Sequence, residues 1–213
     1  MSKTAWDDSI KIVKLTLGIY ETNAYILICR ETGNSVIVDA PGETDKLMQP
    51  LNGTTPRYIL MTHNHMDHVG ALLELKTSLN VPLAAHKLDA DKLPVKTDKF
   101  LSDEDMVVFG NIRLSVLHTP GHTQGSLCFL HDKDLFSGDT LFPGGPGKTG
   151  SPDAFRQILN SITTRLLNLP PDMRIHPGHG ESTTFIHEKS TIVEFCSRTH
   201  PSNLCGDVLW ASS

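Results

Sequence analysis

Seven histidine and aspartate side chains occur in four short polar segments of the chain, and each segment follows an apolar run. These residues offer imidazole nitrogens and carboxylate oxygens, which are ligands that suit Zn, Fe and Mn. None of the seven is a cysteine, which argues against a structural zinc site built from thiolates. We therefore expect a site for two divalent metal ions, with Zn expected first and Fe or Mn as alternatives. The candidate ligands are His63, His65, Asp67, His68, His122, Asp139 and His179.

The four segments, in this order, resemble the motifs of the metallo-β-lactamase superfamily, whose signature is His-x-His-x-Asp-His. The resemblance extends from about Gly18 to Thr184. Within the superfamily the chain is similar to the small glyoxalase II-like hydrolases, because Gly138-Asp139-Thr140-Leu141-Phe142 is followed by glycines and later by a Pro-Gly-His-Gly segment. The segments that carry the resemblance are Thr62–His68, Pro120–Thr123, Ser137–Thr140 and Pro177–Gly180.

The resemblance implies a role for each candidate ligand. His63 and His65 are two apart, and side chains two apart in an extended loop point to the same side, so both can reach one ion. The family pattern adds His122 to this first ion. It assigns Asp67, His68 and His179 to a second ion, and Asp139 to a bridging position between the two.

Structural roles are the alternative for several of these residues. Asp67 alone would suit the N-cap of a helix that begins at Val69. His122 and His179 each follow a Pro-Gly pair, as turn residues do. We expect the remaining histidines not to be ligands, although His118 and His176 lie near the site in sequence and are expected to support it or to lie in the core. The remaining histidines are His86, His118, His131, His176, His187 and His200.

The glycine-rich stretch Pro143–Thr149 does not match a phosphate-binding loop, because the first glycine at the required spacing is missing. It follows Asp139, so we expect it to border the pocket. Lys148 in this stretch is a candidate substrate-binding residue for a carboxylate. A solvated loop lysine is the equally supported alternative.

The resemblance implies a metal-dependent hydrolase, specifically a thioesterase of the glyoxalase II type that uses a metal-bridging hydroxide, with Asp67 and Asp139 as catalytic residues. The expected substrate is a small thioester or a related carbonyl compound. Only 34 residues follow His179, so the helical glutathione-binding domain of glyoxalase II is not expected here. Asp139 stands where the β-lactamases of the superfamily usually carry cysteine.

Other functions remain as alternatives. One is a hydrolase of another ester or lactone. Another is a mononuclear iron oxidoreductase that resembles persulfide dioxygenases, although their Cys-Gly-Arg stretch is replaced here by Gly145-Pro146-Gly147-Lys148. A metal-binding module without activity is the third alternative, and the complete ligand set argues against it.

Length and charge narrow the class of protein. The chain has 213 residues, which fits one domain over residues 1–213. Its net charge is −5 and it has no basic block, so we expect no nucleic-acid partner. The segment Met1–Asp8 does not look like a signal peptide, and no apolar run is long enough for a membrane span.

Cysteine usage favours a cytoplasmic location. The four cysteines show no Cys-x-x-Cys spacing. Cys29 and Cys128 fall in strand-like runs and are expected to be buried, whereas Cys196 and Cys205 are expected to be reduced, with a disulfide between them as the alternative. The sequence carries no feature that sets an oligomeric state.

The elements that must position the ligands can be predicted from periodicity and turn residues. We predict strands over residues 10–17, 24–29, 35–38, 57–61, 83–85, 106–109, 112–117, 127–130, 135–136 and 173–175. We predict helices over residues 44–51, 69–79, 86–93, 152–169 and 186–198, with Ser151 as an N-cap and a polar linker after residue 93. This pattern favours an α+β fold with two packed mixed sheets. The family resemblance sharpens the expectation to a four-layer αββα sandwich.

Overall fold

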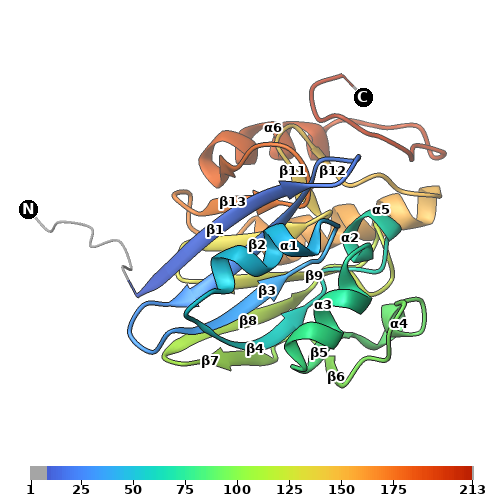
Figure 1. Ribbon diagram of the computed structural model, residues 1–213. Coiled ribbons are helices and arrows are strands. Elements are labelled where there is room, and N and C mark those ends of the chain that lie inside the picture. The colour runs from blue at the N-terminus through green and yellow to red at the C-terminus, as the bar shows by residue number, and fades with distance from the viewer. Residues whose placement is uncertain (1–8, 213) are drawn as a thin grey trace, which may run out of the picture.

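Two six-stranded sheets form the centre of the protein, as the computed structural model of residues 9–212 shows (Figure 1). In the first sheet the strands lie in sequence order; the first three are antiparallel and the last three join in parallel. Met1–Asp8, where we expected no signal peptide, lies outside the described residues. The strands of the first sheet are β1 (Ile10–Leu17), β2 (Thr22–Cys29), β3 (Asn34–Val38), β4 (Thr55–Leu60), β5 (Leu83–His86) and β6 (Lys99–Leu101).

The second sheet has the order β14-β13-β10-β9-β8-β7, and only the pair of β10 and β13 is parallel. A short hairpin of β11 (Leu141–Phe142) and β12 (Gly145–Pro146) stands apart from both sheets. The strands of the second sheet are β7 (Met106–Phe109), β8 (Ile112–His118), β9 (Leu127–His131), β10 (Asp134–Gly138), β13 (Arg174–Pro177) and β14 (Thr183–Thr184).

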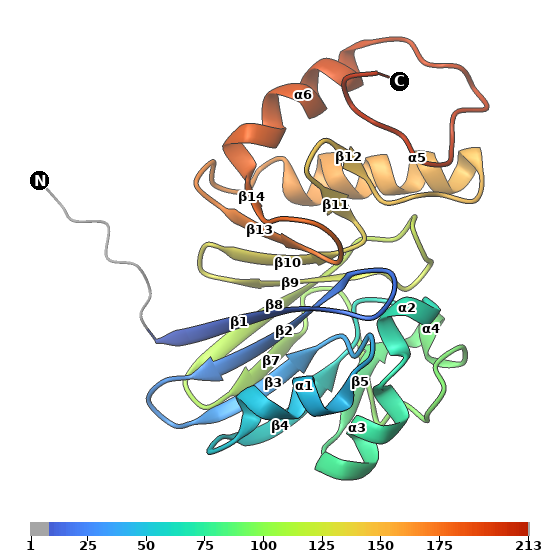
Figure 2. The same ribbon diagram turned by 45° about the horizontal axis from the view of Figure 1, so that its top comes forward.

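Helices cover the outer face of each sheet, so the protein has four layers (Figure 2). One apolar cluster lies between the sheets, a second under the N-terminal helices and a third under the C-terminal helices. The predicted α+β class and αββα sandwich are therefore confirmed. The helices are α1 (Thr44–Met48) with a 3₁₀ turn (Gln49–Leu51), α2 (Met66–Val69), α3 (Leu72–Leu79), α4 (Lys87–Ala90), α5 (Pro152–Ser161) and α6 (Phe185–Ser197).

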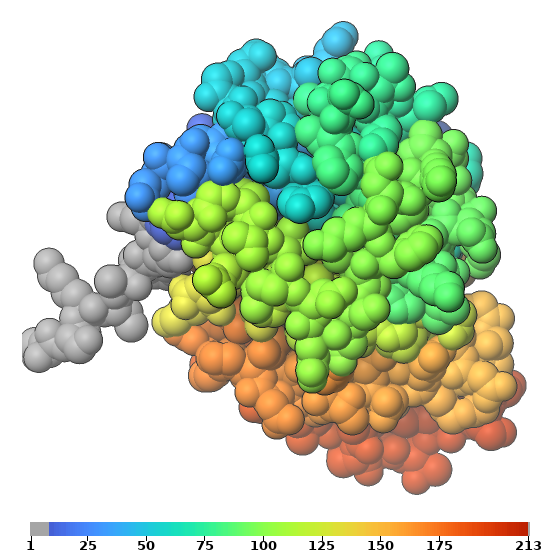
Figure 3. Space-filling view, turned by 90° about the horizontal axis from the view of Figure 1, so that it is seen from below, coloured from blue at the N-terminus to red at the C-terminus, as the bar shows by residue number. Residues whose placement is uncertain are grey.

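The two halves of the sandwich come from the two halves of the chain. In Figure 3 the blue-to-green N-terminal part and the orange and red C-terminal part occupy opposite sides, with the yellow-green segment between them. Strand β2 shows why the core can be recognised in the sequence: Tyr25 and Leu27 face the cluster between the sheets, whereas Ala24 and Ile26 face the helices. Because both faces are buried, β2 is a continuous apolar run rather than an alternating one.

The predicted helix over residues 69–79 is wrong at its start. The structure has two helices, α2 and α3, with a break at Gly70–Ala71. A Cβ on Gly70 would lie 2.3 Å from the carbonyl oxygen of Pro41, so only glycine permits this approach. The Ala71 N–H donates to the Ala40 carbonyl at 2.8 Å, and the Ala40 N–H donates to the His68 carbonyl at 2.9 Å. The chain is thus tied to the end of β3 instead of continuing one helix.

Two other predicted helices are shorter than expected. The helix predicted over residues 86–93 is the single turn α4, and the linker after it contains the strand β6. The helix predicted over residues 152–169 consists of α5 followed by a π-helical turn over residues 162–166. Ser151 is the N-cap as predicted, since its side chain accepts a hydrogen bond from the Ala154 N–H at 3.2 Å. Strands β11, β12 and β14 were not predicted because each has only two residues.

The cysteines follow the expectation from the sequence. Cys29 and Cys128 are buried, and Cys196 and Cys205 are unpaired thiols. Burial raises the pKa of the Cys128 thiol to about 11, and hydrogen bonds from threonine neighbours oppose this only in part. Within residues 9–212, none of the helices has both the length and the apolar character needed to span a bilayer.

Candidate metal centre

The seven candidate ligands converge at the edge of the two sheets where β4, β8, β10 and β13 end. His63, His65, Asp67 and His68 follow β4 of the first sheet. The other three follow strands of the second sheet. Their ligand atoms fall into three overlapping groups, and within each group all atoms lie within 4.8 Å of one another. The first group is His63, His65 and His122, and the second group is Asp67, His68 and His179; the remaining group, His63, His68 and Asp139, joins these two.

The first group consists of three imidazoles, and hydrogen bonds define the ring orientations of His63 and His122. His122 Nδ1 lies 2.7 Å from the Lys148 carbonyl oxygen, so Nδ1 carries the proton and donates it. His63 Nδ1 lies 3.0 Å from the Thr62 hydroxyl, which itself donates to Asp39, so His63 Nδ1 is also a donor. The Nε2 lone pairs of His63 and His122 therefore face each other at 3.3 Å. Two facing lone pairs suit a shared cation.

The second group places a carboxylate against two imidazoles. Asp67 Oδ2 lies 3.0 Å from His179 Nε2 and 3.5 Å from His68 Nε2. The Nδ1 atoms of both rings are directed away from the centre, toward the Tyr20 carbonyl for His179 (3.1 Å) and toward Asp39 for His68 (2.7 Å). As in the first group, the Nε2 atoms are left as the inward ligands.

Asp139 lies between the two groups. Its Oδ2 is 3.4 Å from His122 Nε2 and its Oδ1 is 3.3 Å from His68 Nε2. Glycines on both sides make room for it: a Cβ on Gly178 would lie 2.1 Å from Asp139 Oδ1, and a Cβ on Gly147 would lie 1.8 Å from the Asp139 carbonyl oxygen. Atoms as close as these, a carboxylate oxygen at Gly178 and a backbone oxygen at Gly147, exclude any side chain at either position.

The residues fit a pair of divalent cations on an observation independent of the motif. His68 Nε2 and Asp139 Oδ1 are buried polar atoms without a hydrogen-bond partner. An unpaired buried polar atom costs about 1–3 kcal/mol, so proteins seldom retain one without a function. A cation at this position would satisfy both atoms. Imidazole and carboxylate donors without thiolates are suited to Zn, Fe or Mn.

The protonation states of three residues also favour metal binding. Burial, with a smaller effect from neighbouring imidazoles, holds the pKa of His63 well below its usual range, so His63 is neutral. Burial opposes ionisation of Asp139, but His68 and other imidazoles outweigh it and lower its pKa. The hydrogen bond with His179 lowers the pKa of Asp67 far below the ordinary value. Neutral imidazole and ionised carboxylate are the forms that bind metal.

His68 is the exception. Its burial disfavours the charged ring, but Asp39 and Asp139 outweigh burial and raise its pKa to about 10. Because the metal-binding form is neutral, a cation must displace a proton from His68. Metal affinity is therefore expected to depend on pH.

Asp39 is a candidate functional residue that the sequence analysis missed. It is 1% exposed, and it accepts hydrogen bonds from the Thr62 N–H (2.8 Å), the Thr62 hydroxyl (2.7 Å) and His68 Nδ1 (2.7 Å). Its backbone has φ 62°, which is uncommon for a residue other than glycine. Asp39 could have been found in the sequence because it is a carboxylate that directly follows a buried strand, as Asp139 does.

The start of β2 is a second feature that was missed. The Asn23 N–H donates to the Gly178 carbonyl at 2.7 Å, and the Asn23 side-chain amide donates to the Pro177 and Gly180 carbonyls at 2.9 Å. Its neighbour Thr22 donates its hydroxyl to Asp67 Oδ2 at 3.2 Å. Strand β2 thus fixes the loop that carries His179.

The histidines that were expected not to be ligands lie outside the three groups. His118 stacks on His86 with ring centroids 4.0 Å apart. His176 bridges Asp134 (2.7 Å) and the Ser182 hydroxyl (3.2 Å). His176 therefore supports β13 and the loop after it. The N-cap alternative for Asp67 is wrong, because α2 begins at Met66 and its N-cap is His65.

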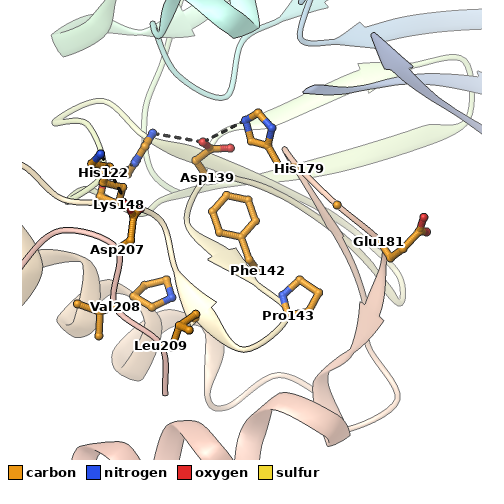
Figure 4. A pocket seen from close by; sticks show the side chains of 13 residues that line it. His122, Asp139, Phe142, Pro143, Lys148, His179, Glu181, Asp207, Val208 and Leu209 are labelled. Carbon is orange, nitrogen blue, oxygen red and sulfur yellow. Dashed lines mark hydrogen bonds and ion pairs between the residues drawn. The ribbon is translucent and has the colours of Figure 1, made fainter. Parts of the chain in front are cut away.

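A cavity of about 560 Å³ opens onto three of the candidate ligands, His122, Asp139 and His179 (Figure 4). The glycine-rich stretch borders this pocket, as expected from the sequence, and Lys148 is among its lining residues. The Lys148 ammonium lies 3.6 Å from Asp207 Oδ2 in an exposed ion pair.

Comparisons with known proteins show what this chain is similar to. The family profile described as "Metallo-beta-lactamase superfamily" matches residues 17–179. Hydroxyacylglutathione hydrolase GloC from Haemophilus influenzae is 34% identical over 186 residues, which are 76% of this chain and 88% of that protein.

Three solved structures show the same fold. The BLEG-1 B3 metallo-beta-lactamase has a TM-score of 0.74 at 30% identity and covers 84% of this chain and 97% of its own. The protein TTHA1623 in a di-iron-bound form has a TM-score of 0.70 at 35% identity, covering 83% and 96%. ETHE1 from Myxococcus xanthus has a TM-score of 0.74 at 26% identity, covering 84% and 81%.

Proposed function

The chain belongs to the metallo-β-lactamase superfamily and is a metallo-hydrolase, and on this premise we propose that it hydrolyses thioesters with two divalent ions. The observation that carries the proposal is the position of Asp139 between two separate imidazole groups. One ion would be held by His63, His65 and His122, and the other by Asp67, His68 and His179, with Asp139 touching both. The similarity to hydroxyacylglutathione hydrolase GloC supports a thioester as the substrate.

The reaction consumes one water molecule. The water oxygen forms a bond to the acyl carbon, the carbon–sulfur bond breaks, and the thiol leaves with a proton from the water, so the products are a carboxylic acid and a thiol. When bound, two such ions lower the pKa of water and polarise the carbonyl group.

The chain's own residues supply orientation and a place for protons. Asp67 is fixed by the Thr22 hydroxyl and by His179, so its carboxylate oxygen is directed to the centre. Asp139 is buried among imidazoles and stays ionised. These two carboxylates would hold the attacking water and accept its hydrogen bonds. The contacts of β2 with the loop that carries His179, and the close approach of Gly147 and Gly178 to Asp139, hold the ligands in place.

Zn is our first proposal for the metal, because the donor set is borderline in softness. Iron is the alternative, and the di-iron form of TTHA1623 supports it. Manganese, which suits carboxylate ligands, is the third candidate. We also propose a reducing, cytoplasmic compartment, since all four cysteines are unpaired thiols.

A mononuclear iron oxidoreductase is the second candidate. It would need only His63, His122 and Asp139 as ligands. That function leaves the second group unexplained, because His68 Nε2 is buried without a hydrogen-bond partner and Asp67 and His179 converge on it. A hydrolase of another ester or lactone would use the same geometry.

The test is a comparison of three substrates on one preparation, loaded in turn with zinc and with iron. S-lactoylglutathione tests for thioester hydrolysis, nitrocefin tests for β-lactam hydrolysis, and glutathione persulfide tests for sulfur dioxygenation. We expect thioester cleavage to exceed the other two reactions. The protein would be an oxidoreductase if it takes up oxygen with persulfide in the iron form alone and cleaves no thioester in either form. Failure on a panel of esters, thioesters and lactones would contradict a hydrolase.

A further inference from the structure

The pocket beside the candidate metal centre has apolar walls on the sides that do not carry ligands, with three charged residues, Lys148, Glu181 and Asp207, among its other lining residues. Its walls are made by the β11–β12 hairpin and by the segment of residues 207–209 (Figure 4). In Figure 4 Phe142, Pro143, Val208 and Leu209 lie below Asp139 and His179. The volume of about 560 Å³ lies within the range of pockets that hold small organic molecules. The apolar side chains that line it are Phe142, Pro143, Pro146, Val208 and Leu209.

The wall formed by residues 207–209 is held in place by backbone hydrogen bonds. Thr149 and Gly206 form a two-way backbone bridge, with N–O distances of 3.2 and 3.0 Å. The Trp210 N–H donates to the Gly144 carbonyl at 2.9 Å, and the Trp210 ring is 1% exposed against Phe195. Val208 and Leu209 are therefore held against the hairpin, close to the candidate ligands.

Gly145 closes the contact between the two walls. A Cβ at this position would lie 2.5 Å from the Val208 carbonyl oxygen, so the backbones touch there. Leu209 keeps 55% of its surface exposed, whereas Val208 is buried. An exposed leucine at the mouth of a pocket offers apolar surface to a ligand without being needed for the core.

The charged residues of the pocket offer little to an anion. Lys148 is the one lysine or arginine among its lining residues, and its ammonium lies 3.6 Å from Asp207 Oδ2. The carboxylate of Glu181 lies 3.5 Å from Lys14 Nζ. All three charged lining residues outside the candidate ligands, Lys148, Glu181 and Asp207, thus already have a counter-ion. A thiol with net negative charge, such as glutathione, would compete with Asp207 for Lys148.

From the apolar walls and the paired charges we infer that this enzyme takes thioesters with an uncharged, apolar group next to the scissile bond. The inference rests on the proposed thioester hydrolysis and adds the substrate class. The apolar group would pack against Phe142, Pro146 and Leu209. It can belong to the acyl half or to the thiol half of the substrate, because both halves begin at the reacting carbonyl.

The first experiment uses the metal-loaded full chain and two substrate series. One series holds N-acetylcysteamine constant and lengthens the acyl group from acetyl to butanoyl to hexanoyl. The other holds acetyl constant and lengthens an alkyl thiol from ethyl to butyl to hexyl. Burial of one methylene is worth about 0.8 kcal/mol, so kcat/KM should rise about fourfold per methylene in the series whose variable half enters the pocket. The series that rises identifies that half, and no rise in either series would overturn the inference.

Variants then locate the effect. Leu209→Asp places a carboxylate in the apolar wall and should reduce the rise to less than twofold per methylene. Leu88→Asp is the matched control, because Leu88 is 56% exposed on α4 and does not line the pocket. Leu209→Ala gives a second reading if the aspartate variant has a lowered Tm. An unchanged chain-length dependence in both Leu209 variants would overturn the assignment of this wall.

The outcomes separate this inference from the proposed function. Hydrolysis of thioesters without any preference for apolar groups, or a preference for S-lactoylglutathione over the hexanoyl substrate, would contradict the inference alone. Absence of hydrolysis with every thioester would contradict the proposed function, and with it the substrate class.

Discussion

Asp39 and His68 are joined by a buried hydrogen bond of 2.7 Å between Oδ2 and Nδ1. The same carboxylate oxygen accepts the Thr62 hydroxyl, and that hydroxyl accepts from His63. One carboxylate thus sets the ring orientation of a candidate ligand in each of the two groups. Because Asp39 directly follows β3, the first sheet positions this carboxylate beside the metal centre.

Replacement of this carboxylate by a neutral amide tests the relationship. Asparagine tolerates the left-handed backbone of residue 39, so Asp39→Asn removes the charge with little strain. We expect metal affinity to fall about 10–100-fold, as is typical when a ligand loses its supporting hydrogen bond. Competition with a chelator measures the affinity, and Asp45→Asn on the exposed side of α1 is the control. An unchanged affinity would remove Asp39 from the support of the centre.

The two ligand groups predict different metal contents in different variants. The unmodified protein should approach two ions per chain in elemental analysis. Asp139→Ala should lose both ions and turnover, since Asp139 lies between the groups, whereas His179→Ala and Asp67→Ala should lose mainly one ion. A single ion under saturating metal in the unmodified protein would contradict the dinuclear proposal, and full occupancy in Asp139→Ala would contradict the bridge.

The close approach of Gly178 to Asp139 gives a backbone test. A Cβ at residue 178 would lie 2.1 Å from Asp139 Oδ1 and 2.8 Å from His68 Cε1. Gly178→Ala should therefore displace the carboxylate and reduce kcat at least tenfold, with a smaller change in Tm. Gly150→Ala is the control, because a Cβ there meets nothing within 4 Å. Equal activity of the two variants would show that the loop moves aside without cost.

The buried ion network of Asp134 predicts a dependence of stability on pH. Burial opposes its ionisation, but hydrogen bonds from His176 and Arg174 outweigh burial and lower the pKa of Asp134. The folded pKa lies below that of an unfolded aspartate, so the carboxylate stabilises the fold above about pH 4, and this stabilisation is lost as the pH falls through the lowered pKa.

We therefore expect Asp134→Asn to lower the free energy of unfolding at pH 7 by about 1.5–3 kcal/mol, the range for hydrogen bonds to charged groups. The difference from the unmodified protein should shrink toward zero in strong acid. Denaturant unfolding at several pH values measures it. Asp172→Asn serves as the control, because the ion pair of Asp172 with Lys133 is exposed and should contribute little. A difference that does not change with pH would contradict the assigned ionisation.

The candidate ligands could be predicted from sequence because each lies in a segment that follows a strand whose apolar run is easy to recognise. His63 follows β4, and Asp139 follows β10. The packing of the sheets then brings these strand ends together. The sandwich could be predicted for the same reason, with the help of a family resemblance that periodicity alone does not supply.

The features that were missed depend on contacts between distant segments. The break at Gly70 follows from the Pro41 carbonyl, 29 positions earlier in the sequence. The pocket wall at Val208 depends on the backbone bridge between Thr149 and Gly206, and no sequence pattern at either residue predicts this pairing. Asp39 has no neighbouring motif, and its importance comes from Thr62 and His68, which fold against it. Local sequence patterns cannot predict contacts between residues that are far apart in the sequence.

The division of the candidate ligands between the two sheets has a thermodynamic consequence. His63, His65, Asp67 and His68 come from the first half of the chain, and His122, Asp139 and His179 come from the second. Ions held between them would act as a non-covalent cross-link across the sandwich. Each ion would add RT ln(1 + [M]/Kd) to the unfolding free energy, and chelation should lower Tm while hydrogen exchange accelerates first along the seam between the halves. Metal supply would then set the stability of the folded chain as well as its activity.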